Sequence, residues 1–246
     1  MGLILDGTAY EWDLSIPCYS ADRYDRLKVS ALLRLQQEVG EKHIFHFGTT
    51  SQMLRDRYGV AFIITKSRIK INRLPGSEEP VRLTTWCSSL KGIRFMRNYT
   101  LKTPDGEVLT ESKAEVIMIN LKDRSIVRPK DAEYFKNYLY NTDLANSCGD
   151  PKKIDAMCTG EVYERTIRFS DIDYNGHMNN TVYADIMFDF LPSEFREKAP
   201  KEVAINFKNE LLEGETMDVF ADAAADTVTF CGTCGGTDRF TGMINY

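Results

Sequence analysis

The residues NNTVYADIMFDFL, positions 179–191, decide the fold because a helical stripe stands here among runs that are typical of strands. Apolar side chains recur at spacings of three and four: Val182, Tyr183, Ile186, Met187 and Phe190. The two carboxylates, Asp185 and Asp189, fall on other positions of the helical repeat. We therefore expect a helix over 179–191 that buries one apolar stripe.

Strand-like runs lie on both sides of that helix. Before it, residues 163–169 (YERTIRF) alternate in polarity, as a half-buried strand should. After it, four runs are separated by turn residues: 203–212, 216–223, 227–231 and 239–245. Short turns between consecutive runs favour antiparallel pairing.

The first half of the chain repeats this order. An alternating run, 10–16, precedes a helical run, 29–47, whose stripe includes Leu32, Leu35 and Val39. Only strand-like runs follow it: 60–72, 81–89, 94–102 and 107–120. A strand, a long helix and four antiparallel strands, present twice, predict an α+β fold in which each sheet wraps around one central helix.

The connection between the two copies contains turn residues and polar residues. Residues 131–140 have the pattern of a short helix, and residues 142–153, with Gly149-Asp150-Pro151, have that of an exposed linker. These features predict a first domain over 1–130, a linker over 131–159 and a second domain over 160–246.

The composition is that of an ordinary globular protein. Of the 246 residues, 43% are hydrophobic and 27% are charged. No apolar run approaches the roughly 18 residues of a membrane span, and the N-terminus lacks the basic region and apolar core of a signal peptide. These observations argue against an integral membrane protein, and we expect a soluble, cytoplasmic chain.

The six cysteines, in a chain without a signal peptide, are expected to be reduced thiols. One pair has a suggestive spacing, Cys231-Gly-Thr-Cys234. A zinc site needs two more ligands, and no second C-x-x-C or paired histidine motif is present; a redox pair opens a helix, whereas this one ends a strand-like run. We therefore expect no metal site and no cofactor.

Charge is distributed unevenly between the two halves. Residues 1–145 hold 22 Lys and Arg against 18 Asp and Glu, a net charge of +4, whereas residues 146–246 hold 9 against 18, a net charge of -9. The total of -5 argues against nonspecific nucleic-acid binding. The basic first half can still present a face to an acidic partner.

The densest group of chemically active side chains is SDIDYNGHMNN, residues 170–180, between a strand and the helix. In extended backbone Asp173, Asn175 and His177 project to one side, because side chains alternate. His177 stands in a polar loop, where its imidazole can act as a general base near neutral pH. This loop is therefore the candidate catalytic segment.

Other polar residues near these segments are better explained by structure. Asn179 or Asn180 is expected to cap the helix that follows the loop. His43 and His46 continue the stripe of the first helix, so we interpret both as structural.

The string SDIDYNGHMNNTVY, residues 170–183, resembles the active-site segment of acyl-acyl carrier protein (acyl-ACP) thioesterases of the bacterial type. These enzymes have two tandem hotdog domains. In the family a D-x-N-x-H element is joined by a Glu on a later strand, and residues 206–210 (NFKNE) are similar to that strand. Three further segments are similar to the N-terminal hotdog domain: 27–38, 91–97 and 116–120. The resemblance covers nearly the whole chain and implies two tandem hotdog domains.

The resemblance implies hydrolysis of the thioester of fatty acyl-ACP, which releases free fatty acid and ends chain elongation. The catalytic set that it implies is Asp173, Asn175, His177 and Glu210, without a cofactor. Backbone N–H groups at the start of the helix can stabilise the oxyanion, and either Glu210 or His177 can activate water. Plant members often carry a cysteine after the Glu; here Leu211 disfavours a covalent cysteine mechanism.

The first half lacks a matching set. Alignment places Leu74 opposite Glu210, and the loop 19–27 holds no D-x-N-x-H element. We expect one active site per chain, with apolar residues of both halves lining an acyl tunnel whose depth sets chain length. Two alternatives stay open: a hotdog dehydratase that acts on a 3-hydroxyacyl thioester, and a noncatalytic acyl-thioester-binding protein.

An acidic carrier, which the resemblance implies, needs a basic docking face. Candidates lie on one strand and on a nearby hairpin: Lys66, Arg68, Lys70, Arg73, Lys91, Arg94 and Arg97. Alternation puts Lys66, Arg68 and Lys70 on one side of the strand, opposite Ile69 and Ile71. The sequence leaves the choice between acyl carrier protein and coenzyme A open, and also leaves a homodimer open.

Overall fold

The computed structural model describes residues 3–5, 8–129 and 140–246. The helix expected over 131–140 falls on the undescribed residues 131–139. The first half contains α1 (Val29–His46), α2 (Ser51–Tyr58) and six strands: β1 (Leu3–Leu5), β2 (Ala9–Ser15), β3 (Val60–Ile71), β4 (Pro80–Lys91), β5 (Arg94–Lys102) and β6 (Val108–Asn120). The second half contains α3 (Val182–Asp189) and five strands: β7 (Glu161–Thr166), β8 (Glu202–Phe207), β9 (Thr216–Ala224), β10 (Thr227–Cys234) and β11 (Thr237–Asn245).

The described strands form one antiparallel sheet in the order β1-β2-β4-β5-β6-β3-β8-β11-β10-β9-β7. Apart from β1, the order of the first half, β2-β4-β5-β6-β3, is mirrored by β7-β9-β10-β11-β8 in the second. The halves join where β3 pairs with β8, with Ser67 opposite Ile205 and Ile69 opposite Val203. This arrangement confirms the predicted fold of two tandem hotdog units.

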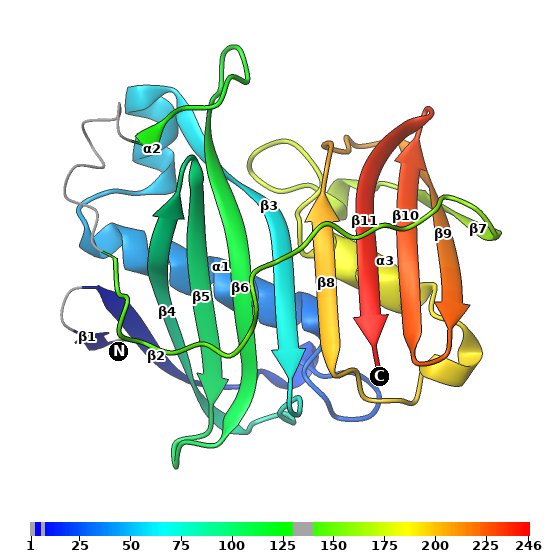
Figure 1. The fold of residues 1–246 in the computed structure, drawn as a ribbon, viewed down its shortest axis with the longest axis horizontal. Helices are drawn as coiled ribbons and strands as arrows, with labels where there is room; N and C mark the ends of the chain where they lie inside the picture. The colour runs from blue at the N-terminus through cyan, green and yellow to red at the C-terminus, as the bar shows by residue number, and fades with distance from the viewer. Residues whose placement is uncertain (1–2, 6–7, 130–139) are drawn as a thin grey trace.

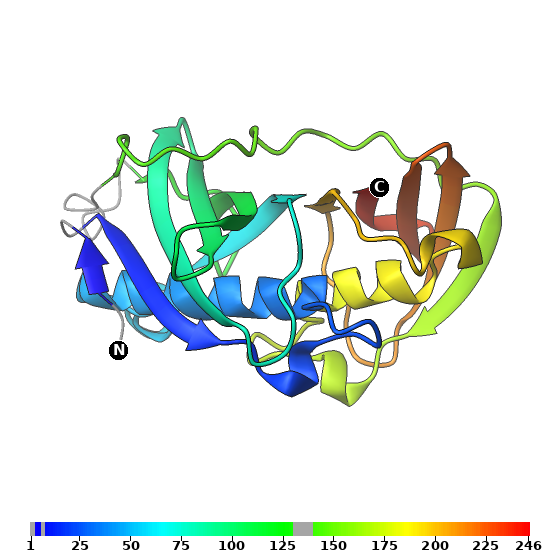
Figure 2. The same ribbon diagram turned by 90° about the horizontal axis from the view of Figure 1, so that it is seen from below.

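The two central helices lie end to end along the concave side of the sheet (Figure 2). The predicted stripes are buried against it: Leu32 and Val39 of α1 are fully buried, and so are Ile186 and Met187 of α3. Each helix therefore packs its apolar stripe against the strands of its own half of the chain. The repeated sequence pattern gives a repeated fold for this reason.

The short helix α2 departs from the expectation that only strands follow the first long helix. The Thr50 side chain accepts a hydrogen bond from the Met53 N–H at 3.0 Å, and Gly59, with a φ of 64°, ends the helix. Within α2 only Leu54 is buried, so the segment has no apolar stripe that periodicity could detect.

Residues 140–160, which we call the strap, cross the convex face of the sheet from one half to the other (Figures 1 and 2). The Asp150 carboxylate bridges Lys91 and Lys113. At the second half, the Asn206 side chain accepts from the Ile154 N–H at 2.7 Å and donates to the Lys152 carbonyl at 3.0 Å. The predicted linker therefore binds to both halves of the sheet.

The sulfurs of Cys158, in the strap, and Cys231, on β10, form a disulfide. The expectation that all six cysteines are reduced is therefore wrong for this pair. The C-x-x-C spacing of Cys231 and Cys234 does not reveal this disulfide. The partner of Cys231 is Cys158, which lies 73 residues earlier in the chain.

Neither α1, α2 nor α3 is long and apolar enough to cross a membrane, and these are the α-helices among the described residues.

The basic residues predicted as a docking face are occupied by partners within the chain. On β3 alternation holds, since Ile69 and Ile71 are buried while the cations take the convex face. The partners are Glu115 for Lys66 and Arg94, Glu202 for Arg68, Ser147 for Lys70, Glu79 and Glu107 for Arg73, Asp150 for Lys91, and His43 and Thr85 for Arg97. Each of the seven cations therefore also holds together parts of the chain, and carrier docking on them stays a prediction.

Reversing the charge of Arg68 tests how much its contact with Glu202 stabilises the fold. Arg68→Glu puts a second carboxylate beside Glu202 and beneath the strap, so we expect the free energy of unfolding to fall by about 1–3 kcal/mol, the range for a hydrogen-bonded charged pair. Thermal unfolding of the purified variant measures the loss. Lys152→Glu, an exposed change on the strap, is the control. An Arg68 variant as stable as the unchanged chain would show that the pair contributes nothing.

Candidate active site

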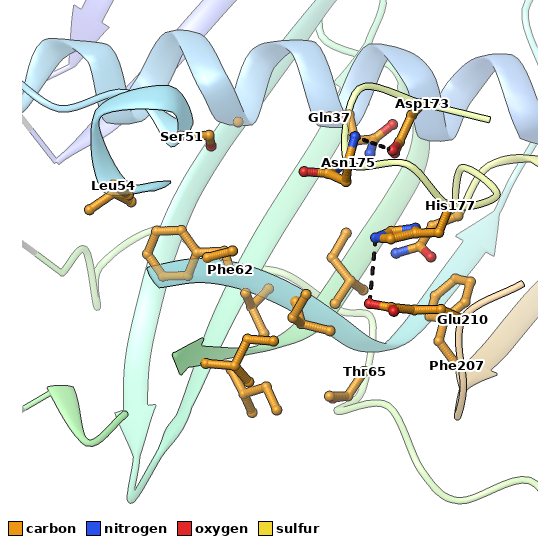
Figure 3. A pocket seen from close by; sticks show the side chains of 18 of the residues that line it. Gln37, Ser51, Leu54, Phe62, Thr65, Asp173, Asn175, His177, Phe207 and Glu210 are labelled. Carbon is orange, nitrogen blue, oxygen red and sulfur yellow. Dashed lines mark hydrogen bonds and ion pairs between the residues drawn. The ribbon is translucent and has the colours of Figure 1, made fainter. Parts of the chain in front are cut away.

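A cavity of about 790 Å³ lies between the two halves of the chain. Its walls come from α1, α2, β3, β5 and β6 of the first half and from two loops of the second half, 173–180 and 207–210. The volume falls within the usual range of small-molecule sites, roughly 300–1,000 Å³. Figure 3 shows the polar residues of the second half at one side and the apolar side chains of the first half below and beside them.

The catalytic segment is a tight turn and is not extended as expected. The Asp173 N–H donates to the His177 carbonyl at 3.0 Å, and the Gly176 N–H donates to the Asp173 carbonyl at 2.9 Å. Gly176 has a φ of 84°, a conformation that glycine adopts without strain. Asp173, Asn175 and His177 nevertheless all line the cavity, because the turn gathers them instead of alternation.

A partly buried ion pair anchors this turn to the preceding strand. Arg165 of β7 donates to both carboxylate oxygens of Asp171, at 2.9 and 3.0 Å. The same carboxylate accepts from the Arg168 N–H at 2.8 Å. The start of the segment is thereby fixed relative to the sheet.

The Asp173 carboxylate binds groups of the turn and does not bind the His177 imidazole. Its Oδ1 accepts from the Asn175 N–H at 2.8 Å, and its Oδ2 accepts from the Asn179 side chain at 3.2 Å. Asn179 also orders the turn before α3, since its own Oδ1 accepts from the Thr181 N–H at 2.9 Å. The prediction that Asn179 or Asn180 caps the helix is wrong, because α3 begins at Val182 and its N-cap is Thr181, whose side chain makes no capping hydrogen bond.

His177 faces Glu210 across the cavity mouth. His177 Nδ1 lies 3.4 Å from the Met178 carbonyl, which can only accept a hydrogen bond. Nε2 lies 3.6 Å from Glu210 Oε1, and in the tautomer with its proton on Nδ1 the neutral ring directs the Nε2 lone pair towards that carboxylate. Figure 3 shows this pair, with Asp173 and Asn175 above it.

Glu210 lies in a loop and not on a strand as expected. β8 ends at Phe207, because the N–H groups of Lys208 and Asn209 both turn to the same carbonyl, that of Arg239. The loop that follows is held from two sides: Arg239 donates to the Glu210 carbonyl, and Leu211 is fully buried. Glu210 reaches the site from this loop.

Two arginines of the first half contact candidate catalytic residues of the second, and sequence reasoning missed both. Arg124 forms an ion pair with Glu210 Oε1. Arg55 of α2 donates to Asn175 Oδ1 at 3.2 Å. No spacing in the sequence marks these contacts, which join residues 86 and 120 positions apart.

Apolar side chains of the first half form part of the cavity wall. The apolar lining includes Ile44, Leu54, Phe62, Phe95, Val116 and Ile119. Arg97 also lines it and contacts His43 Nδ1 at 3.0 Å and Thr85 Oγ1 at 3.2 Å. Burial, with Arg97 nearby, lowers the pKa of His43 to about 3, which keeps this ring neutral and agrees with its interpretation as structural.

Comparison with known proteins follows the same division of the chain. Residues 7–138 match the family model for the acyl-ACP thioesterase N-terminal domain, and residues 155–233 match that for the C-terminal domain. An acyl-[acyl-carrier-protein] hydrolase of Cuphea viscosissima is 24% identical over 92% of this chain, and an oleoyl-acyl carrier protein thioesterase of Coriandrum sativum is 23% identical over 95%. The chain spans 54% and 68% of the lengths of these two relatives.

Solved structures are similar over the whole chain. An acyl-ACP thioesterase from Bacteroides thetaiotaomicron has a TM-score of 0.89 at 18% identity, with 98% of each chain covered. A 12:0-ACP thioesterase from Umbellularia californica has a TM-score of 0.82 at 15% identity, covering 99% of this chain and 98% of that one. At these identities the similarity establishes a common fold.

Proposed function

The chain belongs to the acyl-ACP thioesterase family, and from this premise we propose that it hydrolyses fatty acyl-ACP to free fatty acid and the carrier thiol. The observation that carries the proposal is that His177 and Glu210 face each other in the wall of a cavity that apolar side chains of the first half also line. A thioester placed beside this pair has its acyl chain in the cavity and its carrier outside.

A water molecule between His177 and Glu210 is the proposed nucleophile. The 3.6 Å between Nε2 and Oε1 is too long for a direct hydrogen bond, and both atoms are acceptors when the ring is neutral. A water that donates one hydrogen to each atom directs its oxygen lone pair towards the thioester carbonyl. Both side chains thus orient the water.

We assign the water proton to His177, because an imidazole is a stronger base than a carboxylate. The new C–O bond forms as the proton moves to Nε2, and Glu210 then faces an imidazolium, which it stabilises. When the C–S bond breaks, the imidazolium returns the proton to the leaving sulfur, which departs as a thiol. The step needs no metal or cofactor.

Two donors are proposed for the oxyanion of the tetrahedral intermediate. Near the start of α3, the N–H groups of Asn179, Thr181 and Val182 already donate hydrogen bonds to Asp171 or Asn179, so they are engaged within the chain. The neighbouring Asn180 lines the cavity, so its N–H is our candidate backbone donor. The side-chain amide of Asn175 is the second.

We propose that the two halves divide the work, with acyl binding in 1–130 and catalysis in 160–246, joined by 131–159. Asp173, Asn175, His177 and Glu210 supply the chemistry, and only Asp173 acts indirectly, through the turn. The proposed carrier is acyl carrier protein, on the ground of family membership. The seven basic residues stay its proposed docking face: each also contacts another group of the chain, but Lys91 and Arg94 keep more than half of their side chains exposed.

Thiol release from a panel of acyl thioesters tests the function. The purified chain, given acyl-ACP substrates of graded length, should release one free thiol for each fatty acid formed. The same acyl groups on coenzyme A provide the control for the carrier, and we expect slower release from them. A 3-hydroxyacyl-ACP is added to the panel, because loss of water from it, with a double bond formed and no thiol released, would indicate a dehydratase. Retained ligand with neither product would indicate a noncatalytic binding protein.

A further inference from the structure

We propose that Arg124 and Arg55 of the first half are positioning residues for Glu210 and Asn175 of the second. The inference rests on the proposed thioesterase function and extends it. The first half is expected to supply only a binding surface for the acyl chain. The two arginines give it a second task, since the catalytic set is held in place from both halves.

The contact of Arg124 is aimed at the reacting end of Glu210. Its Nη2 pairs with Oε1, the same oxygen that faces His177 Nε2. The Arg124 side chain is 51% exposed and that of Glu210 36% exposed. An ion pair this open to solvent contributes little to folding. Stability is therefore a weak explanation for the pair, and its place beside His177 favours a role in the reaction.

The backbone at Arg124 supports the same conclusion. Its φ is 62°, in the left-handed region that glycine and asparagine favour. Its N–H donates to the Asn120 carbonyl at 2.9 Å, and the Asn120 N–H donates to the Ser125 carbonyl at 2.9 Å, which fixes the turn after β6. A residue with a side chain is strained in this conformation. The residue found here uses its side chain to reach Glu210.

Glu210 needs a restraint of this kind because its loop has no regular structure. The Arg239 contact and the burial of Leu211 hold the backbone on either side. Neither contact fixes the torsions of the Glu210 side chain. If the carboxylate turns away from His177, no water can be held between the two. Arg124 fixes the direction of the carboxylate.

Arg55 restrains Asn175 in a comparable way. Its Nη1 donates to Asn175 Oδ1 at 3.2 Å, and its guanidinium lies 4.4 Å from the centre of the Tyr174 ring. With Oδ1 engaged by a donor, the amide presents its NH₂ group to other partners. The oxygen of a thioester carbonyl accepts hydrogen bonds and can be bound by this NH₂ group. Arg55 therefore selects the orientation of Asn175 in which the NH₂ group can face the substrate.

The test is a double-mutant cycle on the full-length chain. We expect Arg124→Gln to lower kcat about 10- to 100-fold and to change KM less than about 3-fold, because it disturbs the reacting group rather than the acyl cavity. Arg124→Lys, which keeps the charge, should recover most of the loss. Lys122→Gln removes the same charge from the same turn and is the matched control, with unchanged kcat.

The decisive comparison is made in the Glu210→Gln background. If Arg124 acts through the Glu210 carboxylate, Arg124→Gln should change the residual kcat there by less than about 2-fold. The same cycle on Arg55→Gln and Asn175→Ala, with Arg57→Gln as control, tests the second contact. Thermal unfolding of each variant separates lost positioning from lost folding.

Three outcomes overturn the inference while the proposed function stands. They are an Arg124→Gln variant with unchanged kcat, equal losses with and without the Glu210 carboxylate, and a loss explained by unfolding. A different result, no thiol release by the unchanged chain from any acyl thioester, overturns the proposed function and this inference with it.

Discussion

Replacing Glu210 by Gln or His177 by Ala is expected to lower kcat for thioester hydrolysis about 100-fold or more, while the fold is kept. Glu210→Gln keeps the size of the side chain and removes its charge, so it takes away one of the two acceptors that orient the water. His177→Ala removes the base and the acid that returns the proton to sulfur. Release of thiol from acyl-ACP measures both effects.

The controls for this prediction come from the same regions of the chain. Glu213→Gln changes an exposed carboxylate three residues from Glu210, and His46→Ala removes an exposed imidazole of α1. Both should hydrolyse substrate like the unchanged chain. A folded Glu210→Gln or His177→Ala variant with near-normal turnover would remove that residue from the catalytic set.

The fold could be predicted because its decisive signals are local and repeated. The apolar stripes of α1 and α3 each extend over about two helical turns or more, which is long enough to recognise in the sequence. Strand-like runs follow each of them. The alternation on β3 correctly separated the buried Ile69 and Ile71 from the cations. Such periodicities report directly on burial, which is the largest stabilising contribution.

Periodicity failed where a segment has no apolar repeat. The helix α2 depends on the Thr50 cap and on Gly59, with Leu54 its one buried residue. The polar and turn residues of the strap correctly predict an irregular segment. They do not predict that Asp150 and the backbone N–H of Ile154 bind to side chains of the sheet. Composition identifies a loop but not the surface that it covers.

For the candidate site, the sequence supplied the residue types and the structure supplies their arrangement. The D-x-N-x-H spacing brought Asp173, Asn175 and His177 to attention, although a tight turn gathers them. Glu210 was identified through resemblance alone, since nothing in its own loop distinguishes it from Glu213 or Glu215. Contacts from the other half, such as that of Arg124, depend on tertiary packing and leave no local pattern.

Separating the two halves is expected to abolish hydrolysis. Neither residues 1–145 nor residues 146–246, produced alone, should release thiol from acyl-ACP. The first half holds no His177 or Glu210, and the second lacks the part of the cavity formed by α1, β3, β5 and β6. The second half would also expose the edge of β8, where the buried Val203 and Ile205 pair with β3 in the intact chain.

A cleavage experiment distinguishes the need for both halves from a need for an unbroken chain. A protease site placed at residues 142–145 allows the folded protein to be cut within the strap. The cut protein should stay assembled and active, because β3 still pairs with β8, α1 still contacts α3, and Arg68 still pairs with Glu202. Catalysis then depends on the apposition of the halves rather than on their covalent link. Thiol release by either half alone at a rate near that of the intact chain would contradict a catalytic centre assembled from both.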